Sequence, residues 1–400
     1  MLRLTRLALT QFRNYPGLTW RPGARIAVVT GPNGSGKTNL LEAISLLQPG
    51  RGLRGARMAD LARQAPDAPG RWGVAARVLR GGTVADLGTG TPPDGPSDRR
   101  VFRLNGAAPR NQAEVAAVVA AVWLTPQMDR LFQEGASGRR RFLDRLVWAL
   151  EPGHAREVSA YETAMASRNR LLVGGGADPA WLAGVEDSMA RHAVAVAAAR
   201  AALVSRLNAV LAGGAAGRFP VAQLALSDAI ADRLAAQPAL AVEDGLRAAL
   251  ANDRGRDAAA GSAAQGAHRS DMLLSDAASG VSAALASTGQ QKALLIGVVL
   301  GHAALMADAR GDAPLLLLDE PAVHLDADRR AALWEALAGL SAQVLLTGTD
   351  PEPFAALRGL AEGLRTGGDT LRPDPAFPTA PPVVPSAVPS AVPPAFPVVP

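Results

Sequence analysis

Eight consecutive residues near the N-terminus carry the groups that hold a nucleoside triphosphate. The segment Gly31–Thr38 (GPNGSGKT) matches the pattern G-x-x-x-x-G-K-[ST] at every defined position. In this pattern glycines let backbone N–H groups turn inward on the phosphates, the lysine reaches the β- and γ-phosphates, and the threonine hydroxyl can ligate Mg²⁺. We therefore predict ATP and Mg²⁺ as cofactors. The predicted nucleotide contacts are Gly31, Asn33, Gly34, Ser35, Gly36, Lys37, Thr38 and Asn39.

A second motif supplies carboxylates. The apolar run Leu315–Leu318 indicates a buried strand, and it ends in Asp319 and Glu320. Asp319, together with Thr38, would hold the Mg²⁺, and Glu320 would polarise the attacking water. The alternative is a buried strand that ends in a solvated acidic turn, and a phosphate loop elsewhere in the chain weakens that alternative.

A third motif opens a helix late in the chain. Ser287–Lys292 (STGQQK) begins with a good helix-capping residue, and its Ser–Gly pair exposes hydrogen-bond donors at the positive end of a helix. Such an end can bind an anion. Taken alone, ordinary helix capping explains the segment equally well.

Composition limits the classes of protein. Of 41 basic residues only Lys37 and Lys292 are lysine, both inside these motifs, and the formal charge of +5 is compatible with a nucleic-acid partner. The absence of cysteine excludes disulfide scaffolds, thiolate zinc sites and cysteine catalysis, and fits a reducing cytosol. Met1–Thr10 lacks the features of a signal peptide, and the longest apolar runs are too short to span a bilayer. We expect a cytoplasmic protein with no membrane partner.

Strands and helices must place these motifs together. A predicted strand at Arg25–Thr30 runs into the glycine loop, and a predicted helix at Thr38–Gln48 follows it. Further alternation predicts a parallel sheet, with elements at Ala121–Thr125, Ser287–Met306 (helix), Pro314–Leu318, Asp326–Leu340 (helix) and Gln343–Thr347. The other predicted strands are Leu2–Phe12, Trp72–Leu79, Thr83–Leu87 and Arg100–Leu104, with a tight turn at Asn105-Gly106.

The chain is predicted to have four parts. Residues 1–136 would form the N-terminal part of an ATPase lobe, and the Ala-rich residues 137–260 a helical subdomain of two or three long helices. Residues 261–372 would complete the ATPase head. Residues 373–400 are rich in Pro, Ala and Val and repeat SAVP, which predicts a disordered or polyproline-like tail. A solvated extension is the favoured role of that tail, and a short docking motif is the alternative.

In their order along the chain, the three motifs resemble those of the SMC-like branch of ABC ATPases, whose signature motif is similar to Ser287–Lys292. Other segments, between residues 2 and 350, narrow the resemblance to the RecF family. These segments are Phe12–Tyr15, Asn39–Ile44, Gly138–Asp144, Tyr161–Leu172, Gly266–Asp271 and Thr347–Asp350. The resemblance implies an α/β fold: an ABC-type P-loop ATPase head, with a mixed or parallel sheet and helices, plus an α-helical subdomain.

The resemblance also implies an ATP-dependent DNA-binding protein of recombinational repair and replication. ATP would join two copies into a clamp, with Lys37 and Glu320 of one copy and Ser287 and Gly289 of the other completing each catalytic site. ATP hydrolysis would be slow and DNA-dependent, because the site is complete only in the homodimer. The implied ligand is gapped DNA with single- and double-stranded parts. RecR and RecO are the implied partners, and RecA loading in the SOS response is the implied output.

Some features depart from the wider ABC pattern. Transporter-type domains carry a histidine where this chain has Thr347-Gly-Thr349, and the Pro-rich tail has no place in the RecF pattern. Gln127, in LTPQMD, is either the glutamine that links the two lobes and contacts nucleotide or a polar strand end. A transporter subunit, an SMC-like tether and an ATPase–nuclease fusion are the competing classes. The missing histidine argues against a transporter subunit, and the short insert argues against a tether. The lack of an acidic cluster after the head argues against a nuclease fusion.

Arginine clusters are the candidate DNA contacts. Arg139, Arg140 and Arg141 form the densest run, but a helix cannot place all three on one face. At least one of them is expected to pair within the protein, with Asp144 or Glu134. A solvated or ion-paired surface is the alternative to DNA binding.

Two further groups of basic residues are ambiguous. Arg51, Arg54 and Arg57 recur every three residues after the loop's helix and would align if that stretch were helical. Arg51 and Arg54 are included among the DNA contacts. His268 and Arg269 could bind nucleotide or brace the lobes, and a structural histidine is the favoured interpretation.

Overall fold

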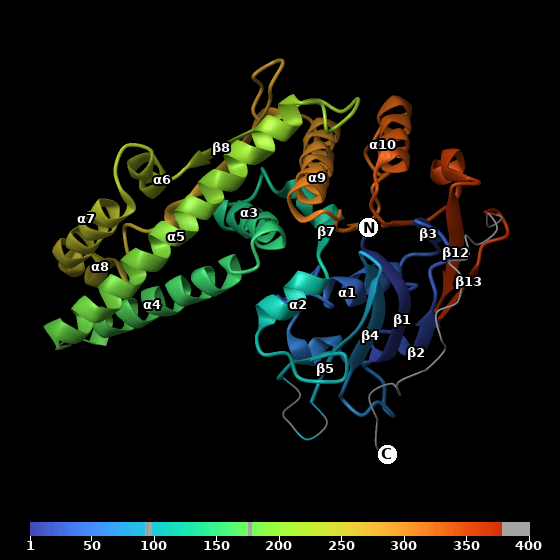
Figure 1. The fold of residues 1–400 in the computed structure, drawn as a ribbon, viewed down its shortest axis with the longest axis horizontal. Helices are drawn as coiled ribbons and strands as arrows, with labels where there is room; N and C mark the ends of the chain where they lie inside the picture. The colour runs from blue at the N-terminus through green and yellow to red at the C-terminus, as the bar shows by residue number, and fades with distance from the viewer. Residues whose placement is uncertain (93, 95–97, 175–177, 378–400) are drawn as a thin grey trace. The chain divides into compact units, whose positions relative to one another are not determined.

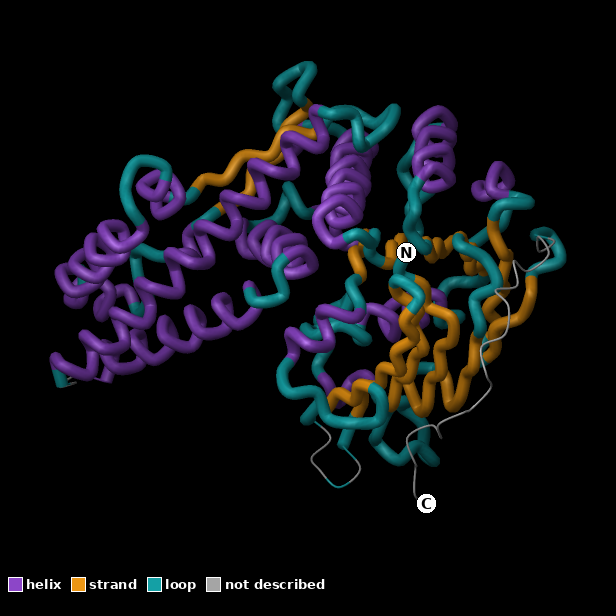
Figure 2. Tube along the Cα trace, viewed as in Figure 1, coloured by secondary structure: helices purple, strands orange, loops and turns teal. Residues whose placement is uncertain are grey.

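Two compact units make up the structure. The computed structural model describes residues 1–92, 94, 98–174 and 178–377. Unit 1 comprises Met1–Asp129, Ala216–Phe219 and the chain from Leu295 onward, and unit 2 comprises Arg130–Ala215 and Pro220–Leu294. Strands dominate unit 1, whereas unit 2 is largely helical (Figure 1, Figure 2).

A six-stranded sheet forms the centre of unit 1, in the order β13-β12-β3-β11-β10-β7. Its strands are β3 (Ile26–Thr30), β7 (Ala121–Leu124), β10 (Leu315–Leu318), β11 (Val344–Gly348), β12 (Ala361–Gly367) and β13 (Thr370–Pro373). All neighbours are parallel except β12 and β13. Every residue of β3, β7, β10 and β11 is buried, as in parallel sheets covered on both faces. The predicted α/β fold class is confirmed, and the carboxyl ends of these strands share one edge.

Helices cover this sheet. They include α1 (Lys37–Ser45), α2 (Gln112–Val118), α10 (Ala327–Gly339) and the C-terminal part of α9 (Thr288–Arg310). Leu40, Leu41 and Ile44 of α1 join Trp123 of β7 and Leu345 of β11 in one buried cluster. This apolar stripe is the one that the sequence periodicity predicts, and it anchors the helix that begins at the glycine loop.

A five-stranded antiparallel sheet completes unit 1, in the order β2-β1-β4-β5-β6. Its strands are β1 (Arg3–Phe12), β2 (Tyr15–Trp20), β4 (Gly73–Arg80), β5 (Thr83–Gly90) and β6 (Val101–Leu104). After β6, Leu104 and Ala107 exchange two backbone hydrogen bonds, and Asn105 and Gly106 have φ of 50° and 82°. The predicted tight turn is therefore present. Sequence reasoning missed β2, because a Pro-Gly pair interrupts its alternation.

Unit 2 is built on long helices. Its helices are α3 (Ala136–Leu150), α4 (His154–Gly174), α5 (Pro179–Ala212), α7 (Ala239–Asn252) and the shorter α6 (Ala229–Leu234) and α8 (Arg254–Ala260). Two strands distant in the sequence, β8 (Ala222–Ser227) and β9 (Asp271–Asp276), pair antiparallel. Ala190, Ala193 and Ala197 of α5 are buried in the cluster that includes Tyr161 of α4 and Leu246 of α7. Small side chains let the helices approach closely. The helical prediction for this stretch missed β8, which lies between α5 and α6.

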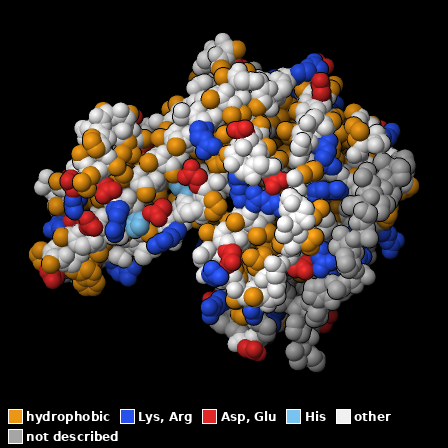
Figure 3. All heavy atoms as spheres, viewed as in Figure 1, with side chains coloured by type: hydrophobic (Ala, Val, Ile, Leu, Met, Phe, Trp, Pro, Cys, Tyr) orange, Lys and Arg blue, Asp and Glu red, His pale blue; other side chains and the backbone are white. Residues whose placement is uncertain are grey.

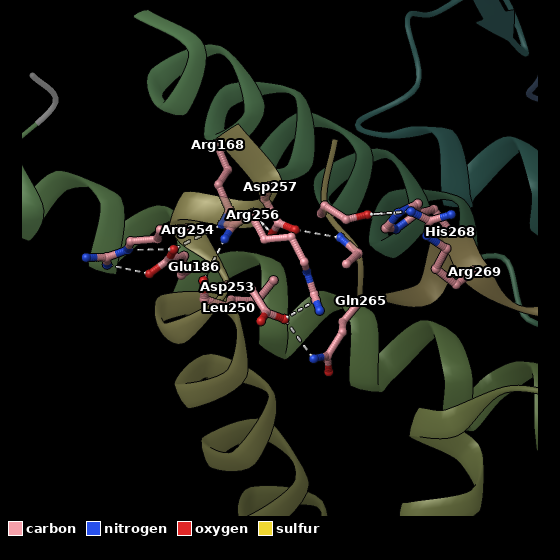
Figure 4. Close-up of polar contacts among 12 residues, drawn as sticks. Arg168, Glu186, Leu250, Asp253, Arg254, Arg256, Asp257, Gln265, His268 and Arg269 are labelled. Atoms are coloured by element: carbon pink, nitrogen blue, oxygen red, sulfur yellow. Dashed lines mark hydrogen bonds and ion pairs between the residues drawn. The ribbon is translucent and has the colours of Figure 1, made fainter. Parts of the chain in front are cut away.

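A buried network of charges ties the helices of unit 2 together (Figure 4). Arg168 is fully buried and donates to Glu186 Oε1 (3.0 Å), Asp257 Oδ2 (2.7 Å) and the Leu250 carbonyl (2.6 Å). Arg254 donates to the second oxygen of Glu186 at 2.5 Å. Removing one charge would leave its partner uncompensated, at a cost of about 3–5 kcal/mol. The network therefore fixes α4, α5 and the junction of α7 and α8.

The units differ from the predicted domain boundaries. β9 pairs with β8 and is joined to α3 by the Arg139–Asp271 ion pair, so residues 261–294 belong to unit 2 rather than to the head. The predicted tail begins at 373, yet Pro373 ends β13, and Asp374 and Phe377 are buried. The rest of the predicted tail, residues 378–400, lies outside the described residues.

Among the described residues, α5 and α9 are long and apolar enough, by length and composition, to cross a membrane. In α9, 78% of the apolar window is buried inside the protein. In α5 the buried residues include Glu186 and Arg200, which belong to polar networks of unit 2. The mostly buried window of α9 is typical of the core helix of a folded protein, whereas 44% of the apolar window of α5 is buried.

Candidate nucleotide-binding site

The glycine loop joins β3 to α1 at the carboxyl edge of the parallel sheet. Gly31, Gly34 and Gly36 have φ of 151°, 80° and 99°, which residues with a Cβ rarely adopt. At Gly31 a Cβ would lie 2.4 Å from the Thr366 hydroxyl, and at Gly36 it would lie 2.4 Å from the Asn14 amide nitrogen. The loop backbone thus turns tightly against its neighbours. The first N–H groups of α1 have no partner within the helix, which suits a phosphate.

Lys37 is buried at the start of α1. Its ammonium donates to the carbonyls of Gly31 (2.7 Å) and Pro32 (3.0 Å). An ammonium carries three donors, so one N–H remains for a phosphate oxygen. The loop's own carbonyls therefore aim the charge into the loop, where a planar guanidinium would not make the same contacts.

Asp319 and Glu320 follow β10 at the same edge as the loop. Asp319 is buried, and its Oδ1 accepts from Thr38 Oγ1 (3.0 Å) and Thr347 Oγ1 (2.6 Å). The Thr347 hydroxyl accepts in turn from the Glu320 N–H at 2.9 Å. Glu320 has a φ of 49°, which is uncommon for a residue with a side chain. Thr347, at the end of β11, thus positions both acidic residues, a role that the sequence did not reveal.

Thr38 and Asp319 offer a hydroxyl and a carboxylate oxygen side by side. Both are the hard oxygen donors that Mg²⁺ prefers, so the pair fits this ion. Among the described residues, no group of three or more His, Cys, Asp or Glu side chains could hold a metal. The remaining ligands would be water and the phosphates of the nucleotide, as is usual for Mg²⁺.

A polar cluster supports the loop from the side of β1 and β2. Asn14 Oδ1 accepts from Asn39 Nδ2 at 2.7 Å, and the Tyr15 hydroxyl donates to the Gly36 carbonyl at 3.1 Å. Burial raises the pKa of Tyr15 to about 12, so the hydroxyl keeps its proton near neutral pH. Two segments that resemble the RecF family, FRNY and NLLEAI, therefore meet beside the phosphate loop.

Two of the candidate DNA-binding arginines lie near this cluster. Arg54 donates to Asn39 Oδ1 at 2.6 Å and to the buried Glu42 at 3.4 Å, where Arg13 also forms a bidentate pair. Arg51 is exposed. The stretch that contains both arginines forms turns and irregular chain. Because it is not a helix, the two side chains are not aligned on one helical face. Both arginines are exposed, but Arg54 already has partners within the protein.

Gln127 stands just beyond the carboxyl end of β7. It is exposed, in the short 3₁₀ helix Pro126–Arg130. Two residues later Asp129 Oδ2 lies 3.4 Å from Nδ1 of His324, in the turn after the acidic pair. β7 and β10 are neighbours in the sheet, so Gln127 and the acidic pair occupy the same edge. This placement makes Gln127 a candidate contact rather than a proven one.

Ser287 and Gly289 belong to unit 2. Ser287 Oγ accepts from the Gln290 N–H (3.4 Å), and Gln290 Oε1 accepts from the Ser287 N–H (2.9 Å), a reciprocal cap on α9. Both Ser287 and Gln290 are exposed, whereas Gln291 and Lys292 are buried. The helix end is thus built by capping and faces outward.

The arginine run at the start of α3 divides into paired and exposed members. Arg139 forms a bidentate ion pair with Asp271 (2.7 and 2.8 Å), and Arg140 donates to the Ser270 carbonyl (2.8 Å). Arg141 is exposed. On the face in Figure 3, basic side chains are scattered over both units with acidic ones among them. Arg141 is therefore the member of this run most accessible to DNA.

His268 is held by its neighbours in unit 2. Its Nε2 lies 2.9 Å from the Ala263 carbonyl, which can only accept, so Nε2 carries the proton and Nδ1 accepts from the Tyr161 hydroxyl at 2.6 Å. Desolvation lowers the pKa of His268. Arg269 also donates to the Ala263 carbonyl, at 3.0 Å. These contacts are those of a structural histidine.

Curated relatives match nearly the whole chain. A protein of Mesorhizobium japonicum called DNA replication and repair protein RecF is 47% identical over 374 residues, which cover 92% of this chain and 97% of the relative. The protein of the same name from Rhizobium meliloti is 46% identical over 362 residues, covering 90% and 96%. A family model described as AAA domain, putative AbiEii toxin, Type IV TA system, matches residues 26–80.

Solved structures share the fold. The recombination mediator protein RecF-ATPrS of the RecFOR pathway superposes with a TM-score of 0.79 at 20% identity, covering 93% of this chain and 98% of the other. An Smc head domain of Pyrococcus furiosus, solved with the C-terminal domain of ScpA, gives a TM-score of 0.51 at 14% identity, covering 93% and 96%. The ATPase-head architecture expected from the motifs is therefore the one observed.

Proposed function

The chain belongs to the RecF family of DNA replication and repair proteins, and we propose that it is an ATP-dependent DNA-binding protein of recombinational repair. One observation carries the proposal: Lys37, Thr38 and Asp319 converge on the glycine loop, with Glu320 held beside them by Thr347. Binding and cleaving a triphosphate requires a loop that binds phosphates, oxygen ligands for Mg²⁺ and a carboxylate near the attacking water. These residues would supply all three.

Different residues of unit 1 would bind the phosphates of ATP, hold Mg²⁺ and position the attacking water. The loop N–H groups and Lys37 would bind the β- and γ-phosphates, and Thr38 and Asp319 would hold Mg²⁺, which neutralises phosphate charge when bound. Glu320 would polarise the attacking water. The Thr347 contact to its backbone would keep that carboxylate beside the loop.

ATP would also join two copies of the chain. Ser287 and Gly289 stand at the outward-facing N-terminus of α9, whose positive end suits the γ-phosphate of nucleotide held by a second copy. Each site would be complete only in this homodimer, so hydrolysis would be slow and would reopen the clamp. Residues of the loop and of the helix end thus act in different copies.

DNA binding would rest on phosphate contacts by arginine. Arg141, Arg51 and Arg54 are exposed. Of the five candidate arginines, Arg139, Arg140 and Arg54 already have partners within the protein. Phosphate contacts position a protein without reading sequence, so recognition would depend on DNA structure. Gapped duplex, with single- and double-stranded parts, is the proposed ligand.

Membership of the RecF family supports a proposal about the pathway in which the protein acts. We propose that the protein acts in the cytoplasm with RecR and RecO, promotes the loading of RecA at gaps, and so contributes to the SOS response. The support is membership of the family, together with the ATP site described above.

A binding experiment tests the proposal. The full chain is titrated with gapped and with blunt duplex DNA, with and without MgATP, across a salt series. We expect tighter binding to the gapped DNA when ATP is present, and an affinity that falls steeply with salt because phosphate contacts release counterions. Equal binding to both DNAs, independent of ATP, would rule the proposal out. Arg141→Ala should weaken binding more than Arg139→Ala, provided that both variants melt as the parent does.

A further inference from the structure

The strands β12 and β13 lie against the strand that feeds the glycine loop. β12 runs parallel to β3 and places Arg365 opposite Thr30, the last residue before the loop. The next residue of β12, Thr366, is 2% exposed, and its hydroxyl lies beside Ser35 of the loop. Neither strand was predicted from the sequence, and neither carries a nucleotide-binding motif.

The Thr366 hydroxyl bridges the two ends of the loop. It donates to the Thr30 carbonyl at 3.2 Å, and its oxygen lies 2.5 Å from the Ser35 hydroxyl. A carbonyl can only accept, so the Thr366 proton points to Thr30, and Ser35 donates to Thr366. The Ser35 hydroxyl proton is thereby directed toward β12, and the Ser35 backbone N–H donates to the Pro32 carbonyl at 3.2 Å, within the loop.

The same threonine sets how closely the loop packs. At Gly31 a Cβ would lie 2.4 Å from the Thr366 hydroxyl and 2.8 Å from its carbonyl oxygen, so the first residue of the loop rests directly on this side chain. Thr30 is also tied down, because its hydroxyl donates to the buried Asp374 at 3.1 Å. Thr366 and Asp374 therefore hold Gly31 and Ser35 of the loop, and Thr30 just before it, in place.

We propose that Thr366 is a positioning residue of the nucleotide site, which fixes the curvature of the phosphate loop before ATP binds. The inference rests on the proposed ATP binding and adds a determinant of affinity outside the loop motif. A loop already held in its binding shape loses less conformational freedom when the ligand arrives, so it binds more tightly. Thr366 makes no contact with Asp319 or Glu320 among the hydrogen bonds of the described residues, so it should act on binding rather than on cleavage.

Three variants of the full chain test the role. Thr366→Val keeps the shape and removes the hydroxyl, and Thr366→Ser keeps the hydroxyl. Thr91→Val is the matched control, because Thr91 is a buried threonine whose hydroxyl accepts from the Trp72 N–H and not from the loop. The dissociation constant for MgATP is measured by calorimetry, KM and kcat by phosphate release, and the melting temperature without nucleotide.

Thr366→Val loses the contacts to Thr30 and Ser35, so it should weaken MgATP binding by at least about fivefold, the effect of a single hydrogen bond, and raise KM with little change in kcat. Thr366→Ser should bind like the parent, and Thr91→Val should melt like Thr366→Val yet keep the parent affinity.

If Thr366→Val folds poorly, Ser35→Ala breaks the same contact from the loop side and should show the same loss. Parent-like affinity in Thr366→Val, or in Ser35→Ala, overturns the inference. A parent chain that binds no MgATP overturns the proposed function itself.

Discussion

The phosphate loop and the Ser287 helix end are the two proposed contacts to ATP, and they are supported in different ways. Lys37, Asp319 and Thr347 are buried, and each is hydrogen-bonded to another residue of unit 1. Ser287 and Gln290 are exposed, and they cap only each other. The first half is therefore held by contacts within one chain, whereas the second is open to solvent, as our proposal of a contact from outside the chain requires. We have proposed that this is the nucleotide of a second copy.

The largest effect should come from the buried half. Lys37→Met keeps the apolar stem and removes the ammonium. We expect calorimetry to detect no binding of MgATP to this variant. Melting of the variant without nucleotide should stay near that of the parent, because the two carbonyls of Gly31 and Pro32 lose only a donor. Parent-like ATP affinity would show that the loop does not use its lysine.

The exposed half should separate binding from turnover. Ser287→Arg should bind MgATP as the parent does but lose ATP hydrolysis and dimer formation, because a bulky cation blocks the helix end. Ser282→Arg is the matched control, since Ser282 is an exposed serine that caps the preceding 3₁₀ turn. If both variants lose hydrolysis equally, the effect belongs to capping in general. The comparison between the two halves would then fail.

A smaller effect concerns a buried carboxylate in each unit. Burial raises the pKa of Glu362, on β12, to about 7 against a usual value of 4.5. Its contribution to stability is therefore complete below pH 4.5 and is lost as the pH rises through 7.

In unit 2, burial opposes ionisation of Asp144, but hydrogen bonds from His154 and Arg200 outweigh it and lower the pKa below 3.8. That contribution is present above pH 3.8 and is lost as the pH falls through the lowered pKa.

Thermal melts across pH 4 to 8 can check the Glu362 part. Glu362→Gln should be more stable than the parent at pH 8, by on the order of 2 kcal/mol, and the difference should vanish toward pH 4.5. The exposed Glu352, changed to Gln, serves as the control and should show no such trend. A difference between Glu362→Gln and the parent that is constant with pH would contradict the assignment.

The sequence predicted the parts of the site that are contiguous in the chain. Residues 31–38 and 319–320 could be identified because each motif needs its residue types at fixed spacing after a strand. The apolar pattern also predicted β3, α1, β10 and β11, whose buried residues are mostly apolar. Alternation with helices also predicted the parallel pairing of these strands, but not their order in the sheet.

The missed parts come from strands without an apolar pattern. β12 (AEGLRTG) carries Glu, Arg and two glycines, yet Glu362 and Thr366 are buried because the strand lies between β3 and β13. Thr347 was visible in the sequence, but its bond to Asp319 depends on β11 lying beside β10. Pairing between distant strands, rather than local spacing, decides these contacts.

One measurement tests the shared nucleotide site most directly. The mass of Glu320→Gln, which should bind ATP but not cleave it, is determined by light scattering with and without MgATP. We predict a shift from the monomer mass of 41.1 kDa to twice that value with MgATP, and no shift when Ser287→Arg is added to the same chain. A Glu320→Gln chain that stays monomeric with bound ATP, or a double variant that still dimerises, would contradict the account.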